Sequence, residues 1–264
     1  MRIIDPHIHM QSRTTDDYSL MSEAGIVAVC EPAFWLGTDR RWPESHLDYF
    51  NHLSTFEPKR AAKRGIKHYC FLGVNPKESE NIAVSEKVLA HLDEYLDRPT
   101  VLGIGEIGLN KNTPNEIEML KRQLRMAKER KVLCIIHTPH AAEKVAGTEI
   151  IARVIAEIDP PRHLCVVDHC TRATIEMARG TGCWTGLTVY PGKLSTEDAA
   201  GIVRDYGPQR VLVNSSADWE TSDPLATLAT VGTMRSMEMP DSLIERVMWH
   251  NPKEFLGQCS KFQV

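Results

Sequence analysis

Short runs rich in β-branched and apolar residues recur eight times along the chain, and they alternate with amphipathic segments. The runs cover residues 2–5, 26–31, 68–74, 101–106, 132–137, 164–169, 184–189 and 211–215. Helix-like segments with apolar residues at intervals of three and four cover residues 15–24, 83–96, 116–129, 143–157 and 196–206. Strands that alternate with helices in this way predict a parallel sheet.

A closed barrel fits this pattern better than an open sheet. The stretch 132–136 is apolar at every position, as expected of a strand that is covered on both faces. Eight strand and helix units in 264 residues match the size of a (β/α)₈ TIM barrel, which has roughly 250 residues. No linker or shift in composition divides the chain, so we expect a single barrel domain over residues 1–264.

Composition narrows the functional classes. The net charge of −4 gives no overall positive field, so binding of nucleic acid would need a local basic patch. The seven cysteines form no CxxC pair, which favours reduced thiols over a disulfide framework. No apolar run approaches 18 residues and no signal-like segment opens the chain. We therefore expect a cytoplasmic protein without a membrane span.

Polar residues able to bind metal stand where the predicted strands end. His7 and His9 follow the first strand, and side chains two apart in an extended segment project to the same side. In a barrel, catalytic residues gather at the carboxyl ends of the strands. The residues at these ends, in chain order, are His7, His9, Glu31, Asn75, Glu106, His137, His169, Tyr190 and Asp218.

Several motifs at these positions resemble the TatD-like hydrolases, a branch of the amidohydrolase-type metal-dependent barrels. Residues 5–9 read D-P-H-I-H and resemble the opening D-x-H-x-H of the family, and residues 105–109 read G-E-I-G-L. His137 and His169 resemble the histidines that end strands five and six. Residues 251–256, N-P-K-E-F-L, resemble the closing helix. The resemblance runs through the whole chain.

This resemblance implies a centre of two divalent metal ions, commonly zinc, with Mn, Mg, Fe or Ni as alternatives. Glu106 would bridge the ions and assist catalysis. Polarised water would be the nucleophile in a hydrolysis reaction, and Asp218 would take its proton. Asp5 would orient a histidine ligand from behind. The implied ligands of one ion are His7, His9 and Asp218, and those of the other are His137 and His169.

The substrate is expected to contact the loops around the mouth of the barrel. The loop at residues 32–43 is long and combines aromatic residues with arginines, which suits either substrate contact or anchoring of the loop itself. The expected contact residues are Glu31, Trp35, Arg40, Arg41, Trp42, Asn75, His140, Tyr190, Lys193 and Trp219.

The chain departs from the TatD nucleases at three motifs. Asn75 and Pro139 stand where those enzymes have a histidine and an arginine, and residues 214–218 replace their E-T-D. Loss of groups suited to gripping phosphate disfavours nuclease activity. We therefore expect hydrolysis of an ester, phosphoester, lactone or amide of a small molecule. A TatD-type deoxyribonuclease and a metal-retaining, non-catalytic accessory protein are the alternatives.

Two other interpretations compete with a metal centre. Residues 103–108 formally match the dinucleotide fingerprint G-x-G-x-x-G, but the helix that should begin at once is delayed by the turn-like residues 110–114. His137 and His169 could instead be core histidines that are satisfied by hydrogen bonds. Their shared position at strand ends with Glu106 and the opening pair favours the metal hypothesis.

Overall fold

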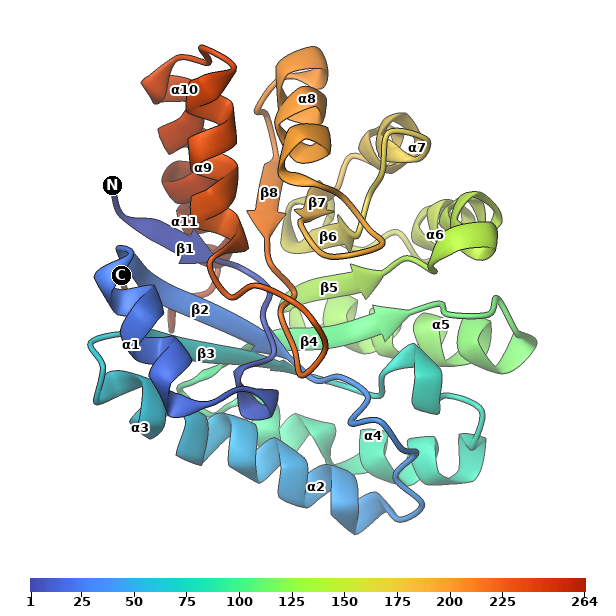
Figure 1. Cartoon of the computed structure of the whole chain (residues 1–264). Coiled ribbons are helices and arrows are strands. Elements are labelled where there is room, and N and C mark those ends of the chain that lie inside the picture. Colours follow the sequence, from blue (N-terminus) through green and yellow to red (C-terminus); the bar gives the residue numbers. More distant parts are fainter.

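Eight parallel strands form one sheet in the order of the chain, from β1 to β8 (Figure 1). The computed structural model describes residues 1–264 except for the side chain of Ala141. The strands are β1 (Ile3–Asp5), β2 (Ile26–Pro32), β3 (Lys67–Leu72), β4 (Val101–Gly108), β5 (Leu133–His137), β6 (Cys165–Asp168), β7 (Trp184–Thr188) and β8 (Val211–Asn214). Each predicted strand is present within about two residues of its expected ends, and the predicted barrel class is confirmed.

Helices surround the sheet on its outer side (Figure 1). Five of them, α1, α4, α5, α6 and α8, coincide with the predicted amphipathic segments. No helix among those described is long and apolar enough to cross a membrane. The α-helices are α1 (Thr15–Glu23), α2 (Pro43–Asn51), α3 (Glu57–Ala62), α4 (Ile82–Leu96), α5 (Pro114–Arg130), α6 (Lys144–Ile158), α7 (Ile175–Gly180), α8 (Thr196–Tyr206), α9 (Ala226–Ser236), α10 (Asp241–Glu245) and α11 (Asn251–Leu256).

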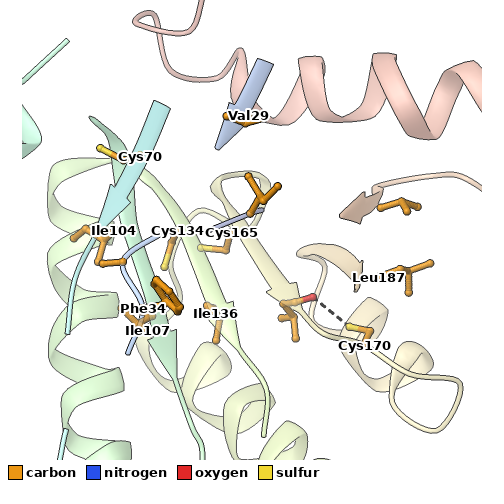
Figure 2. Close-up of a cluster of buried hydrophobic side chains, with 14 of the residues drawn as sticks. Val29, Phe34, Cys70, Ile104, Ile107, Cys134, Ile136, Cys165, Cys170 and Leu187 are labelled. Carbon is orange, nitrogen blue, oxygen red and sulfur yellow. Dashed lines mark hydrogen bonds between the residues drawn. The ribbon is translucent and has the colours of Figure 1, made fainter. Parts of the chain in front are cut away.

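The strands bury apolar side chains on both faces. One cluster contains Ile4, Phe71 and Trp184, and it packs against Phe255 of the C-terminal helix α11. The other cluster lies between strands and helices, and Figure 2 shows part of it, including Val29. Such two-sided burial explains why these strands are apolar at nearly every position. Six of the seven cysteines are buried, and all seven are free.

The first and last strands meet at the end of the barrel that carries the metal-competent residues. The Asp5 carboxylate accepts hydrogen bonds from the backbone amide of Ser215, at 3.3 and 3.4 Å. Just beyond the strands, the amide of Ser216 donates to the carbonyl of His7 at 2.8 Å, and the amide of His9 donates to the carbonyl of Ala217 at 2.9 Å. These contacts bring the opening histidines next to the strand-eight loop.

Candidate metal centre

Glu106 of β4 is the common neighbour of three imidazoles that come from different strands. Its Oε1 lies 3.0 Å from Nδ1 of His137 at the end of β5, and 3.1 Å from Nε2 of His169 after β6. His7, which follows β1, places Nε2 at 3.5 Å from the same oxygen. One carboxylate oxygen therefore sits where three strand ends converge.

His9 completes the group of imidazoles. Its Nε2 lies 3.1 Å from Nε2 of His7, and its ring stacks on Phe34 with the ring centroids 3.9 Å apart. The four histidines and Glu106 are each at most 6% exposed. Five of the six expected ligands are thus brought together in a site largely closed to water.

Two ring nitrogens in this site have no hydrogen-bond partner among the described residues. They are Nδ1 of His9 and Nε2 of His137, and both are buried. A buried polar atom without a partner is costly, so such atoms call for a ligand. Imidazole nitrogen together with carboxylate oxygen is a donor set suited to zinc and similar ions. The residues present therefore fit the divalent metal that the sequence implies.

The pKa values of His9, His137, His169 and Glu106 favour the protonation states that bind metal, whereas the carboxylates of Glu106 and Asp168 outweigh burial and raise the pKa of His7. Burial lowers the pKa of His9 and of His169 well below the ordinary value, and the positive charge of Lys193 contributes to the effect at His169. Burial also lowers the pKa of His137. Burial alone would raise the pKa of Glu106, but the nearby His7 and His137 hold it well below its usual range. Neutral imidazoles beside a carboxylate are the states that metal binding requires.

Asp168, at the end of β6, orients His7. Its Oδ2 lies 2.5 Å from Nδ1 of His7, while Oδ1 accepts a hydrogen bond from Nδ2 of Asn214 at 3.0 Å. A carboxylate at Nδ1 keeps the proton there and turns the Nε2 lone pair toward Glu106. Gly186 makes room for this carboxylate, because a Cβ at that position would lie 1.9 Å from Oδ1 of Asp168.

Asp5 does not occupy the orienting position that the sequence suggested for it. Its carboxylate accepts the backbone amide of His7 at 3.1 Å and that of Ser215, so it fixes the backbone rather than an imidazole ring. Asp168 carries out the orienting contact instead. Asp168 was not among the residues expected at the site, although it directly precedes His169, which was expected there.

The loops after β5 and β6 are joined by a buried lysine. Nζ of Lys144 donates to Oγ1 of Thr138 and to the carbonyl of His169, both at 2.8 Å. His169 has a φ of 57°, in the left-handed region, where a non-glycine residue stores strain. Its Nδ1 lies 2.6 Å from Oγ1 of Thr188. These contacts hold His169 in an unfavourable backbone conformation with its Nε2 directed at Glu106.

Asp218 stands at the rim of the site rather than in the group of converging ligands. Its Oδ1 accepts hydrogen bonds from the hydroxyl of Tyr190 and from the amide of Glu220, each at 2.9 Å. The residue nevertheless lines the pocket above the metal-competent group. The structure therefore brings Asp218 to the site but engages one of its two oxygens elsewhere.

The pocket over these ligands is narrow, with a volume of about 70 Å³. Asn75, also predicted from the sequence, donates through Nδ2 to Oε2 of Glu106 at 3.2 Å. Phe34 and Lys77 line the pocket too, although neither was expected there from the sequence. Of the predicted substrate-contact residues, those that line the pocket are Trp35, Asn75, His140, Lys193 and Trp219.

Comparison with known proteins shows which family the chain belongs to. The family model described as TatD related DNase matches residues 4–256. The chain belongs to this TatD-related family. It is 30% identical to a metal-dependent hydrolase of Methanocaldococcus jannaschii, over 96% of this chain and 99% of that protein. The family resemblance inferred from the sequence motifs is thereby confirmed.

Solved structures show the same fold. The TatD-like protein of Archaeoglobus fulgidus is 31% identical and superposes with a TM-score of 0.81, covering 96% of this chain and 99% of that one. The phosphotriesterase homology protein of Escherichia coli, in complex with phosphate in its active site, superposes with a TM-score of 0.72 at 14% identity. That match covers 97% of this chain and 98% of the other. The chain therefore belongs to a family of TatD-related, metal-dependent hydrolases.

Five of the predicted substrate-contact residues do not line this TatD-type pocket, and four of them come from the loops after β2 and β7. Arg40 pairs with both carboxylate oxygens of Glu78, with Nη2 to Oε2 at 2.6 Å, and so anchors the loop after β2. Arg41 and Trp42 extend into solvent, and Trp42 is 69% exposed. Tyr190 reaches Asp218 but otherwise lines a neighbouring cavity.

Glu31 is the fifth predicted contact residue that the structure places outside the pocket. Its Oε2 lies 2.8 Å from Nε2 of His68, and its Oε1 accepts the amide of Gln11 at 2.8 Å. Glu31 shares the outward face of β2 with Val29, which packs in the cluster between strands and helices. The two-residue period of the strand could have revealed this orientation.

Proposed function

We propose that this protein uses two divalent metal ions, with zinc expected, to hydrolyse an ester or phosphoester bond of a small molecule. The observation that carries the proposal is the convergence of three imidazoles on one oxygen of Glu106. A carboxylate in that position suits a ligand shared by two ions. The free cysteines support a reducing compartment such as the cytoplasm as its location.

When bound, the ions would activate water and polarise the bond to be cleaved. The protein's own residues would then have separate tasks. Glu106 would hold the ions at a fixed separation, and Asp168 would keep Nε2 of His7 available by retaining the proton on Nδ1. Asp218 would receive the proton of the attacking water on Oδ2, because Oδ1 is engaged by Tyr190 and Glu220.

The volume and charge of the pocket favour a small, anionic substrate. A pocket of about 70 Å³ has room for a reacting group but not for a polymer segment. Lys77 and Lys193 line it, and neither forms an ion pair with a carboxylate among the described residues. Trp35 and Trp219 flank the opening. Two such ammonium groups favour a substrate whose reacting part is negatively charged.

A panel of carboxylic esters, phosphate esters, lactones and amides tests the proposal, with the enzyme supplied with zinc or manganese. We expect turnover of at least one class of substrate. Glu106→Gln should lower the rate by about 100-fold or more, because it removes a proposed metal ligand on which the reaction would depend. Glu31→Gln is the matched control, since it alters another buried glutamate of a strand outside the site. It should retain activity.

Single-stranded DNA belongs in the same panel because the family model is described as a DNase. Metal-dependent cleavage of DNA without turnover of small esters would support the nuclease hypothesis instead. Stoichiometric metal with no turnover of any substrate would contradict hydrolysis and support an accessory role. Equal activity of Glu106→Gln and the wild type would refute the assignment of the site.

A further inference from the structure

A second cavity, far larger than the metal pocket, lies beside it. Its volume is about 520 Å³, within the range of about 300–1,000 Å³ typical of small-molecule sites. It is formed by the loop after β7, by residues 221–223 after β8, and by the α9 helix. We call it the β7–α9 cavity. It has the room that the metal pocket, at about 70 Å³, lacks.

The β7–α9 cavity offers an apolar surface. Val189 and Leu194 come from the loop after β7, and Ala226 and Ala229 come from α9. Tyr190 lines it as well, and its hydroxyl reaches Asp218 at the rim of the metal pocket. Apolar side chains of this kind would take up a hydrocarbon or aryl group and release water from both surfaces.

Lys193 lines both the β7–α9 cavity and the metal pocket, so the two spaces adjoin along one side chain. Its Nζ lies 3.4 Å from Nδ1 of His169 and 3.4 Å from Oγ of Ser216. Nδ1 of His169 must carry a proton when Nε2 serves as a metal ligand, and Thr188 is then its acceptor. The ammonium of Lys193 is then left to pair with a negative group of the substrate.

We propose that the β7–α9 cavity binds the apolar leaving group of a phosphate monoester whose phosphate is held beside Lys193. This inference rests on the proposed function and adds the substrate class to it. In the reaction, the oxygen of water forms a bond to phosphorus and the bond from phosphorus to the ester oxygen breaks. One proton of the water passes to that oxygen, so the products are the apolar alcohol and hydrogen phosphate.

A third cavity, of about 240 Å³, lies on another side of Lys193 and provides an internal comparison. It is lined by His140, Lys144 and Ala173 among others. The half-buried imidazole of His140 and the buried ammonium of Lys144 make this cavity less suited to a hydrocarbon. Ala173 and Ala229 are both exposed alanines at the edge of a cavity, so enlarging either side chain carries a similar and small risk to folding.

Binding of 1-naphthyl phosphate and methyl phosphate measures the contribution of the apolar group. Isothermal titration is carried out on chelator-treated protein, and KM values are obtained on the metal-loaded enzyme. We expect the wild type to bind the naphthyl ester at least ten-fold more tightly. Ala229→Phe should reduce this preference to less than three-fold, with little change for methyl phosphate. Ala173→Phe should keep the preference of the wild type.

Equal affinity of the wild type for the two esters would overturn the proposal. So would loss of the preference in Ala173→Phe with its retention in Ala229→Phe, because that result would place the apolar group in the smaller cavity. A preserved pattern of binding without any hydrolysis of phosphate esters would refute the proposed phosphoester chemistry while supporting the cavity as an apolar subsite. The two failures are therefore distinguishable.

Discussion

Replacing Asp168 by asparagine should weaken metal binding, although Asp168 is not itself among the proposed ligands. The contact between Oδ2 and Nδ1 of His7 is 2.5 Å long and both residues are buried. A hydrogen bond to a charged group contributes about 1.5–3 kcal/mol. Loss of a carboxylate behind a histidine ligand typically costs about 10–100-fold in metal affinity, which is about 1.4–2.7 kcal/mol. The two figures agree, and we expect a 10–100-fold rise in the Kd for zinc.

Competition with a chromophoric chelator at pH 7.5 measures this Kd, and urea unfolding checks that the variant is folded. Asp5→Asn is the matched control because Asp5 is also buried but accepts the backbone amides of His7 and Ser215 and contacts no imidazole ring. It should change the Kd by less than about three-fold. Wild-type zinc affinity in Asp168→Asn, or an equal loss of affinity in Asp5→Asn, would refute the orienting role of Asp168.

Two further substitutions test residues that the structure places outside the site. Burial raises the pKa of Glu31 well above its ordinary value, so its contribution to stability is present at low pH and lost as the pH rises through that raised pKa. Glu31→Gln should therefore lose less stability than the wild type between pH 5 and 8 in urea titrations. If the free energy of unfolding of Glu31→Gln were more than about 3 kcal/mol below that of the wild type at neutral pH, Glu31 would instead form a charged pair with His68. Arg40→Ala removes the guanidinium that pairs with the buried Glu78 and leaves it the backbone amide of residue 40 and the more distant imidazole of His46, at 3.7 Å, so it should lower the free energy of unfolding by about 3–5 kcal/mol. The exposed Arg41→Ala should remain within about 0.5 kcal/mol of the wild type, and equal losses would refute the anchoring role.

The strands could be predicted almost completely because their signals are local. Apolar and β-branched runs such as residues 132–136 form β5 where the sequence placed it. The expected ligands also followed from local position, since His137 and His169 end or directly follow consecutive strands. A parallel barrel brings such ends together whatever the loops do.

The orienting carboxylate could not be chosen from the sequence. Asp5 is two residues from His7, whereas Asp168 is separated from it by 161 positions and meets it only across the barrel. Which of the two contacts the imidazole depends on the directions of side chains in the closed structure. Sequence proximity selected the wrong neighbour for the ring, since Asp5 turns to the backbone.

The partners of the residues in the loop after β2 could not be predicted from the sequence for a different reason. The arginines and aromatic residues of this loop are equally suited to substrate and to self-anchoring, and only the partner decides between them. Arg40 finds Glu78, which lies 38 positions away in the segment after β3. The same segment brings Lys77 to the mouth of the pocket, where its Nζ lies 4.6 Å from the ring centre of Trp35. Loop pairing of this kind is set by tertiary contacts.

Metal content is the most direct test of the central claim that Glu106 and four histidines form a dinuclear centre. Purified protein, equilibrated with zinc and freed of excess metal, is analysed by plasma mass spectrometry alongside His137→Ala. We predict two equivalents of zinc in the wild type and at most one in the variant, with unchanged far-UV circular dichroism in both. A folded wild type that retains no zinc, or a His137→Ala variant that retains two equivalents, would contradict the account.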